Sequence, residues 1–163
     1  MTEEKRVEIE KPNGHYCFAC GTANPIGLNL DFYRVGDMVC SEVALDKVHV
    51  GWENIAHGGI ISTLLDEVMS WAIMYRKKVF LVTRNMSVKY VRPVSIGMPL
   101  TVRGWLVDDS EPPKIKARAE IRDDQERLLV RSRGEFVELS EKQLSLIPKE
   151  VKREMDALFE KFQ

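Results

Sequence analysis

The arrangement of apolar and polar residues predicts one long buried helix near the middle of the chain. From Gly58 to about Arg76, apolar side chains fall at positions 60, 61, 64, 65, 68, 69 and 71 to 74, which leaves almost no polar face. A helix that is apolar on nearly every side is expected to lie inside a fold. Its polar exceptions are not scattered, because Ser62, Asp66 and Ser70 are spaced four residues apart and share one narrow stripe.

Strand patterns flank this helix on both sides. Before it, residues 28–32 alternate between apolar and polar side chains and residues 38–45 are rich in strand formers, so the two segments predict a hairpin across Gly36 and Asp37. After it, turn signals rich in proline, glycine and aspartate separate further segments, which we expect to form consecutive antiparallel strands. These segments are residues 79–91, 100–107, 115–121 and 128–137.

The strand patterns also indicate how the elements pack. Residues 114–122 alternate strictly between charged or polar and apolar side chains, which predicts one face in water and the other against an apolar partner. The central helix is the obvious partner. The economical architecture is therefore α+β, with an antiparallel sheet of five to six strands wrapped around one long helix.

The two ends of the chain differ from this middle part. Residues 1–24 form a polar lead-in with turn signals, in which we expect no regular structure, and residues 25–140 form the main domain. Residues 141–163 predict a tail helix that starts at Pro148. Its apolar stripe consists of Val151, Met155, Leu158, Phe159 and Phe162.

Composition narrows the class of protein. With 163 residues, 44% hydrophobic and 30% charged, the chain reads as one soluble globular domain. A net charge of -1 gives no bulk reason to bind nucleic acid or an anionic membrane. No run approaches the ~20 apolar residues that span a bilayer, and the start lacks an apolar signal region, so we expect a cytoplasmic protein without disulfides.

Candidate chemistry gathers at the start of the central helix. The segment His57-Gly58-Gly59 leads into the helix, whose first turn offers backbone N–H groups without intrahelical partners. Asp66 lies two turns further along, in a helix that is nearly all apolar, where a carboxylate has few structural reasons to be. Backbone donors beside a buried acid suggest a catalytic site.

These residues carry a resemblance to a known family. A His-Gly-Gly segment followed by an acid nine residues after the histidine, here Asp66, resembles the hot-dog-fold acyl-CoA thioesterases of the phenylacetate-pathway and 4-hydroxybenzoyl-CoA types. Residues 85–93 resemble the family's long strand, which runs beside the active site and ends in a proline. The resemblance covers roughly residues 25–138. It implies the hot-dog fold, in which an antiparallel sheet wraps around one central helix.

The resemblance also implies an activity and roles for individual residues. The family hydrolyses a thioester to a free acid and coenzyme A, which is part of the substrate, so no separate cofactor is expected. By position, Asp66 is the general base or the nucleophile, the Gly59 N–H is the oxyanion donor, and Thr83 positions the water. Substrate-binding residues at matching or adjacent positions are His57, Gly58, Asn54, Glu67, Arg84 and Asn85.

The resemblance to the family also implies an oligomeric state. In the family, the acid and the oxyanion donor usually come from different subunits, so a homodimer is expected, with a dimer of dimers as an open alternative. One position departs from the pattern: relatives place an asparagine six residues before the histidine, where this chain has Gly51. Asn54 stands three residues later, and which group takes over the asparagine's role is left open.

Other interpretations of the same residues remain. Asp66 and Glu67 could form structural ion pairs with Arg84 or Lys89, and Glu67 is a second choice for the catalytic acid. For His57, a structural role in holding the loop is favoured over a direct catalytic role. A hot-dog hydratase or dehydratase would need a histidine and a carboxylate facing one acyl chain, and an acyl-CoA-binding sensor would use residues 141–163 to recognise a partner.

A cysteine pair in the lead-in has the spacing of a zinc knuckle. Cys17 and Cys20 are separated by two residues and followed by Gly21, but a structural zinc site needs four ligands and no second such pair exists. His15 and Cys40 could in principle complete it. The favoured interpretation is a turn that covers the acyl pocket, without a metal.

Overall fold

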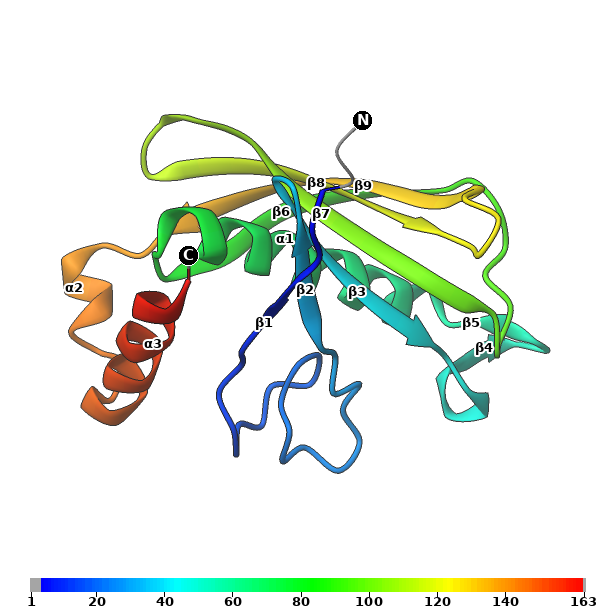
Figure 1. Ribbon diagram of the computed structural model, residues 1–163, viewed down its shortest axis with the longest axis horizontal. Helices are drawn as coiled ribbons and strands as arrows, with labels where there is room; N and C mark the ends of the chain where they lie inside the picture. The colour runs from blue at the N-terminus through cyan, green and yellow to red at the C-terminus, as the bar shows by residue number, and fades with distance from the viewer. Residues whose placement is uncertain (1–3, 163) are drawn as a thin grey trace.

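The computed structural model describes residues 4–162, and its main feature is a long helix packed against one antiparallel sheet (Figure 1). The helix α1 spans Gly58–Lys77, close to the range that its apolar pattern predicts. The sheet has seven strands in the order β1-β2-β3-β7-β8-β9-β6. In sequence order these strands are β1 (Val7–Ile9), β2 (Phe32–Val35), β3 (Met38–Ala44), β6 (Leu81–Tyr90), β7 (Pro99–Glu111), β8 (Lys114–Arg122) and β9 (Leu128–Glu138).

Smaller elements lie at the ends of α1. A short 3-10 helix (Lys47–His49) and a two-stranded ribbon of β4 (Val50–Trp52) and β5 (Ile55–Ala56) lead into the helix start. After the sheet follow a single turn, α2 (Glu141–Leu144), and the tail helix α3 (Lys149–Lys161). Among residues 4–162, no helix is long and apolar enough to cross a membrane.

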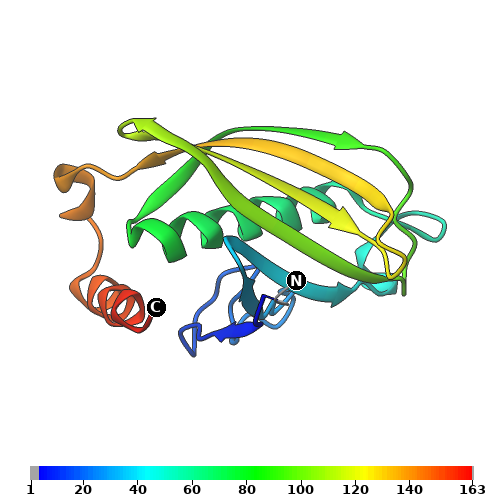
Figure 2. The ribbon, with the colours of Figure 1, turned by 45° about the horizontal axis from the view of Figure 1, so that its top comes forward.

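The core lies between α1 and the sheet that curves over it (Figure 2). The helix buries eight side chains in this layer, because its apolar residues occupy nearly its whole circumference. These are Ile61, Leu64, Leu65, Val68, Met69, Trp71, Ala72 and Ile73. From the sheet, alternate residues of β8 point inward, so that Ile115 and Ile121 are almost fully buried while the intervening residues are more exposed. The alternation seen in the sequence is therefore confirmed.

The sheet differs from the prediction in its extent. It has seven strands rather than five to six, since β1 forms within the lead-in that was expected to be irregular. The first predicted strand is also misplaced, because β2 begins at Phe32 and not at residue 28. The preceding residues pair with the lead-in instead, through hydrogen bonds from Leu28 N–H to the Phe18 carbonyl and from Leu30 N–H to the Ala19 carbonyl. The hairpin turn at Gly36 and Asp37 is confirmed.

Strand order also departs from chain order. The four strands after α1 are antiparallel, but β6 pairs with β9, the last of them, and β7 pairs with β3 on its other side. This places β6 at the edge of the sheet, with ten residues that have no second strand beside them within the described chain. The four strands are thus consecutive in the chain and antiparallel, as expected, but β6 and β7 are not neighbours in the sheet. Local sequence patterns indicate which residues form strands. The order of the strands within the sheet depends on how the sheet closes around α1.

The tail helix packs on the C-terminal half of α1. It begins directly after Pro148, as expected, and Leu158, Phe159 and Phe162 are buried. Phe162 lies 6.3 Å from Trp71 between ring centroids and therefore joins the tail to α1. Val151 departs from the predicted stripe, since it is 39% exposed on the first turn, before the helix reaches the core.

Candidate active site

The start of α1 is capped by the side chain that precedes it. His57 is the N-cap residue, and its Nδ1 accepts a hydrogen bond of 2.9 Å from the Gly59 N–H. The imidazole thereby satisfies one of the backbone donors that a helix start leaves without an intrahelical partner. The predicted oxyanion donor at Gly59 is thus already paired in this structure. Among residues 4–162, the exposed Gly58 N–H has no such partner.

A tyrosine from the edge strand fixes this helix start to the sheet. The Tyr90 hydroxyl, at the end of β6, donates to the Gly58 carbonyl at 2.7 Å, and lies 3.0 Å from the Ser62 hydroxyl. With its own proton directed at Gly58, the tyrosine oxygen accepts from Ser62. Tyr90 was not among the residues expected at the site, although its place five residues after Asn85, within the family-like strand, was a usable signal.

Asp66 and Thr83 lie in direct contact, as the family pattern implies for two members of one site. The Thr83 hydroxyl donates to Asp66 Oδ1 at 2.7 Å, which joins the middle of α1 to the edge strand β6. Asp66 is partly exposed and Thr83 is exposed. The structural ion pairs considered for Asp66 are not formed, since Arg84 lies 3.8 Å from Glu135 instead and the described residues show no ion pair of Asp66.

Glu67 faces a different neighbour, although it is adjacent to Asp66 in sequence. Its Oε1 accepts a 3.0 Å hydrogen bond from the Trp71 indole N–H and lies 3.8 Å from the Cys17 sulfur. Burial raises the pKa of Glu67 to about 7. The two acids therefore belong to separate environments: Asp66 contacts the edge strand and Glu67 contacts the N-terminal lead-in.

Not all of the remaining predicted site residues lie near Asp66 and Thr83. Asn54 lies in the exposed β4–β5 turn, where its carbonyl accepts from the Ile96 N–H at 2.9 Å. A β-bulge in β6 between Thr83 and Asn85 changes which way the side chains face. As a result, Thr83 pairs opposite the buried Phe136, whereas Asn85 borders a groove on the outer face of the sheet. Asn85 is thus away from Asp66, contrary to the sequence-based grouping.

An apolar groove opens beside the helix start. It has a volume of about 340 Å³ and lies between β5, the first turn of α1 and the segment that follows β6. Its lining is Ile55, Ala56, Gly58, Ile61, Tyr90, Val91, Arg92, Pro93 and Val94. A groove of this kind can bind an apolar group whose polar end meets the unpaired Gly58 N–H.

The lead-in turn with the two cysteines does not cover this groove. Cys17 and Cys20 line a separate cavity beside Glu67 and Trp71, on another face of α1. Cys40 is far from them in the fold, because it lies in β3 with Tyr33 and Arg103 as its ladder partners. The interpretations of the turn as a cover for the acyl pocket, and of Cys40 as a fourth ligand, therefore do not fit the structure.

Comparison with known proteins relates this arrangement to one superfamily. A sequence model described as the thioesterase superfamily matches residues 53–130, the segment that contains α1 with Asp66 and β6 with Thr83. Over these residues, slightly less than half of the chain, the sequence is similar to the thioesterase superfamily. Its sheet around one central helix is the hot-dog fold of that superfamily, as the resemblance implied. No curated protein matches the chain.

Solved structures of the thioesterase superfamily share the fold. One crystal structure described as a thioesterase superfamily protein is 27% identical, with a TM-score of 0.70 over 75% of this chain and 60% of that one. This chain thus spans less than two thirds of that relative. The E. coli PaaI protein from the phenylacetic acid degradation operon is 17% identical, with a TM-score of 0.63, covering 69% of this chain and 81% of that one.

A further superfamily structure contains a ligand. The protein smu.793 from Streptococcus mutans, bound to acetyl-CoA, is 18% identical, with a TM-score of 0.62 over 69% of this chain and 90% of that one. At this level of identity the likeness concerns the fold alone. The residues of the site are therefore argued from the geometry of this chain.

Proposed function

We propose that this protein is an acyl-CoA thioesterase, which hydrolyses a thioester to a free acid and coenzyme A. The observation that carries the proposal is the 2.7 Å contact between Thr83 Oγ1 and Asp66 Oδ1, in a partly exposed position on the central helix. A carboxylate held by one hydroxyl donor keeps its second oxygen available for a proton or for a carbonyl carbon. The acetyl-CoA bound to the Streptococcus mutans relative supports the substrate class.

In the proposed mechanism, Asp66 acts as a general base on water or attacks the thioester carbonyl directly. A tetrahedral intermediate forms, its oxygen gains negative charge, and collapse breaks the C–S bond so that coenzyme A leaves as a thiol after protonation. If Asp66 is the nucleophile, water then hydrolyses the acyl-enzyme anhydride and regenerates the carboxylate. Thr83 orients the carboxylate in both routes.

Backbone donors at a helix start would stabilise the charge on that oxygen. The Gly58 N–H is available as it stands, whereas the Gly59 N–H is released only when the His57 imidazole turns away from it. The apolar groove beside Gly58 takes the acyl group, and Arg92 at its rim can meet a phosphate of coenzyme A. His57 thus acts through the loop and the Gly59 donor rather than as the base.

We also propose that the active form is at least a homodimer, built on the edge strand β6. Its ten residues form an exposed sheet edge, and long unpaired edges are rare in stable monomers because they pair with other strands. Val82 and Tyr90 of this strand are 49% and 51% exposed. A second copy of β6 would cover them and bring a second helix start towards Asp66.

Sedimentation equilibrium checks the assembly. We expect a mass of at least twice the 18.7 kDa of the chain, retained on dilution to the concentrations used for assays. A dimer of dimers would give twice the dimer mass. A particle of monomer mass with full hydrolytic activity would contradict the proposal that β6 pairs between subunits.

A thiol-release assay tests the activity. Short, long and aromatic acyl-CoAs are incubated with the full chain, and free coenzyme A is measured with a thiol reagent. We expect turnover of at least one class, with equal amounts of free acid and thiol. Formation of a hydrated acyl-CoA without free thiol would support a hydratase instead, and tight binding without any product would support a sensor.

A further inference from the structure

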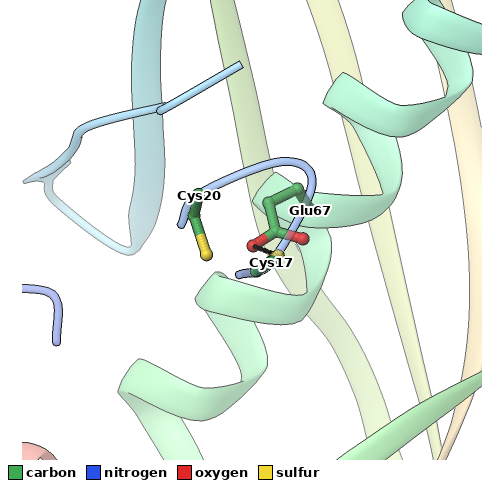
Figure 3. Close-up of side chains that lie close together, drawn as sticks. All are labelled: Cys17, Cys20 and Glu67. Atoms are coloured by element: carbon green, nitrogen blue, oxygen red, sulfur yellow. Dashed lines mark hydrogen bonds between the residues drawn. The ribbon is translucent and has the colours of Figure 1, made fainter. Parts of the chain in front are cut away.

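Two thiols and a carboxylate converge on a face of α1 that the proposed reaction does not use (Figure 3). The sulfur atoms of Cys17 and Cys20 and a carboxylate oxygen of Glu67 all lie within 4.8 Å of one another. The Cys17 sulfur is 3.8 Å from Glu67 Oε1. Figure 3 shows both cysteines on one tight turn of the lead-in, with the glutamate reaching out from the helix towards them.

The turn that holds the cysteines is built closely around them. The Gly21 N–H donates to the Cys17 carbonyl at 2.9 Å, which closes the turn. A Cβ at Gly21 would lie 2.4 Å from the His15 carbonyl oxygen and 2.6 Å from the Cys17 backbone, so only glycine fits. The turn thus holds both sulfur atoms in a fixed arrangement beside Glu67.

Within residues 4–162, no basic side chain forms an ion pair with this cluster, Glu67 included. Two nearby basic side chains have other partners: Lys11 lies 2.9 Å from Asp31 and 2.7 Å from the Leu30 carbonyl, and His15 lies 3.0 Å from Glu154. Converging acidic donors without a counter-charge are the arrangement that a bound metal ion satisfies.

We propose that Cys17, Cys20 and Glu67 bind a zinc ion, whose fourth position opens into the cavity beside them. Zinc takes thiolate sulfur at about 2.3 Å and carboxylate oxygen at about 2.0–2.2 Å in tetrahedral geometry. Tetrahedral donors at those lengths lie roughly 3.5–3.8 Å apart, close to the 3.8 Å between Cys17 and Glu67. The Cys20 sulfur lies within 4.8 Å of both of these atoms, so it would have to approach each by at most about 1 Å to reach the same range.

The cavity supplies the open position. It has a volume of about 160 Å³ and is bordered by Lys11, Pro12, His15, Trp71, Met74 and Met155, in addition to the three ligands. Three protein ligands and one exchangeable ligand distinguish this site from a closed structural zinc site. The ion would tie the lead-in to the central helix and hold Glu67 away from Asp66. This inference does not depend on thioesterase activity.

Metal analysis of the full chain tests the zinc site. The protein is purified under reducing conditions, loaded with Zn²⁺, and titrated against a chromogenic chelator. We expect one tightly held zinc per chain, absent from the Cys17→Ser/Cys20→Ser double variant. Glu67→Gln should weaken binding at least about tenfold, since even groups that only support metal ligands contribute about 10–100-fold. Replacement of zinc by Co²⁺ should give thiolate-to-cobalt charge-transfer absorption.

Cys40→Ala is the matched control, because it removes the one cysteine outside the cluster. It should keep both the zinc and the cobalt absorption. Circular dichroism verifies that each variant is folded. If the double variant does not fold, zinc binding by Glu67→Gln and the cobalt spectrum of the unmodified chain test the proposal instead. Substoichiometric zinc, a cobalt spectrum without thiolate bands, or equal loss in Cys40→Ala would overturn the proposal.

Discussion

Replacement of Asp66 by asparagine is expected to lower kcat for acyl-CoA hydrolysis by about 10²–10⁴-fold, the contribution that a positioned general base typically makes. The amide is nearly the same shape, and its oxygen can still accept from the Thr83 hydroxyl, so the fold and the assembly should be retained. What is lost is the ability to take a proton or to attack a carbonyl. Steady-state thiol release on the best acyl-CoA substrate measures the effect, and sedimentation with circular dichroism confirms the intact protein.

Asp109→Asn provides the matched control, since it makes the same chemical change on β7, where Asp109 pairs with Lys77 at the surface. It should leave kcat unchanged. Thr83 supplies a graded variant: Thr83→Ser keeps the hydroxyl that reaches Asp66, whereas Thr83→Val removes it. We expect serine to keep most of the activity and valine to lose it. Undiminished turnover in Asp66→Asn would exclude this carboxylate as the base or the nucleophile.

Substitution of Gly104 by alanine is expected to lower the free energy of unfolding by about 2–3 kcal/mol, near the upper end of the range for overpacked cores. Gly104 lies on β7 where the sheet meets α1. A Cβ there would lie 2.7 Å from the Val68 carbonyl oxygen and 3.0 Å from the Met69 backbone nitrogen. Backbone atoms cannot rotate aside, so the helix and the sheet must separate. Urea unfolding measures the loss.

Gly134→Ala on β9 is the informative comparison. The three atoms nearest to its added Cβ all belong to side chains, one of Phe136 at 2.6 Å and two of Met69 at 3.1 Å. Both side chains can rotate about their own bonds, and Met69 is flexible, whereas backbone atoms cannot move in this way, so we expect a smaller loss than at Gly104. Equal stability of Gly104→Ala and the unmodified protein would show that the contact between α1 and β7 is looser than the structure indicates.

The elements of this fold could be predicted because their signals are local. The apolar circumference of residues 58–76 indicates burial before any partner is known, and α1 follows it closely. The hairpin turn at Gly36 and Asp37 and the alternation in β8 are likewise contained in a few consecutive residues. The strand β1 was missed because its three residues form a strand only through pairing with β2, far along the chain.

The candidate site was only partly accessible to the same reasoning. The spacing from His57 to Asp66, with the resemblance that it carries, led to the contact between Asp66 and Thr83. The sequence did not indicate that the His57 imidazole occupies the Gly59 donor. The unpaired N–H groups at a helix start can bind either an anion or a nearby acceptor side chain. Which of the two binds depends on the position of that side chain in the folded structure, and here it is the His57 imidazole.

By itself, the sequence determined that one buried helix carries an acidic pair and lies against an antiparallel sheet. Only the tertiary structure decided what each acid meets. Successive helical residues point about 100° apart, so Asp66 faces the edge strand and Glu67 faces the cysteine turn. The β6 bulge likewise turned Asn85 to the outer face. Such contacts join residues that are distant in the chain, and they exist only once the sheet has closed around α1.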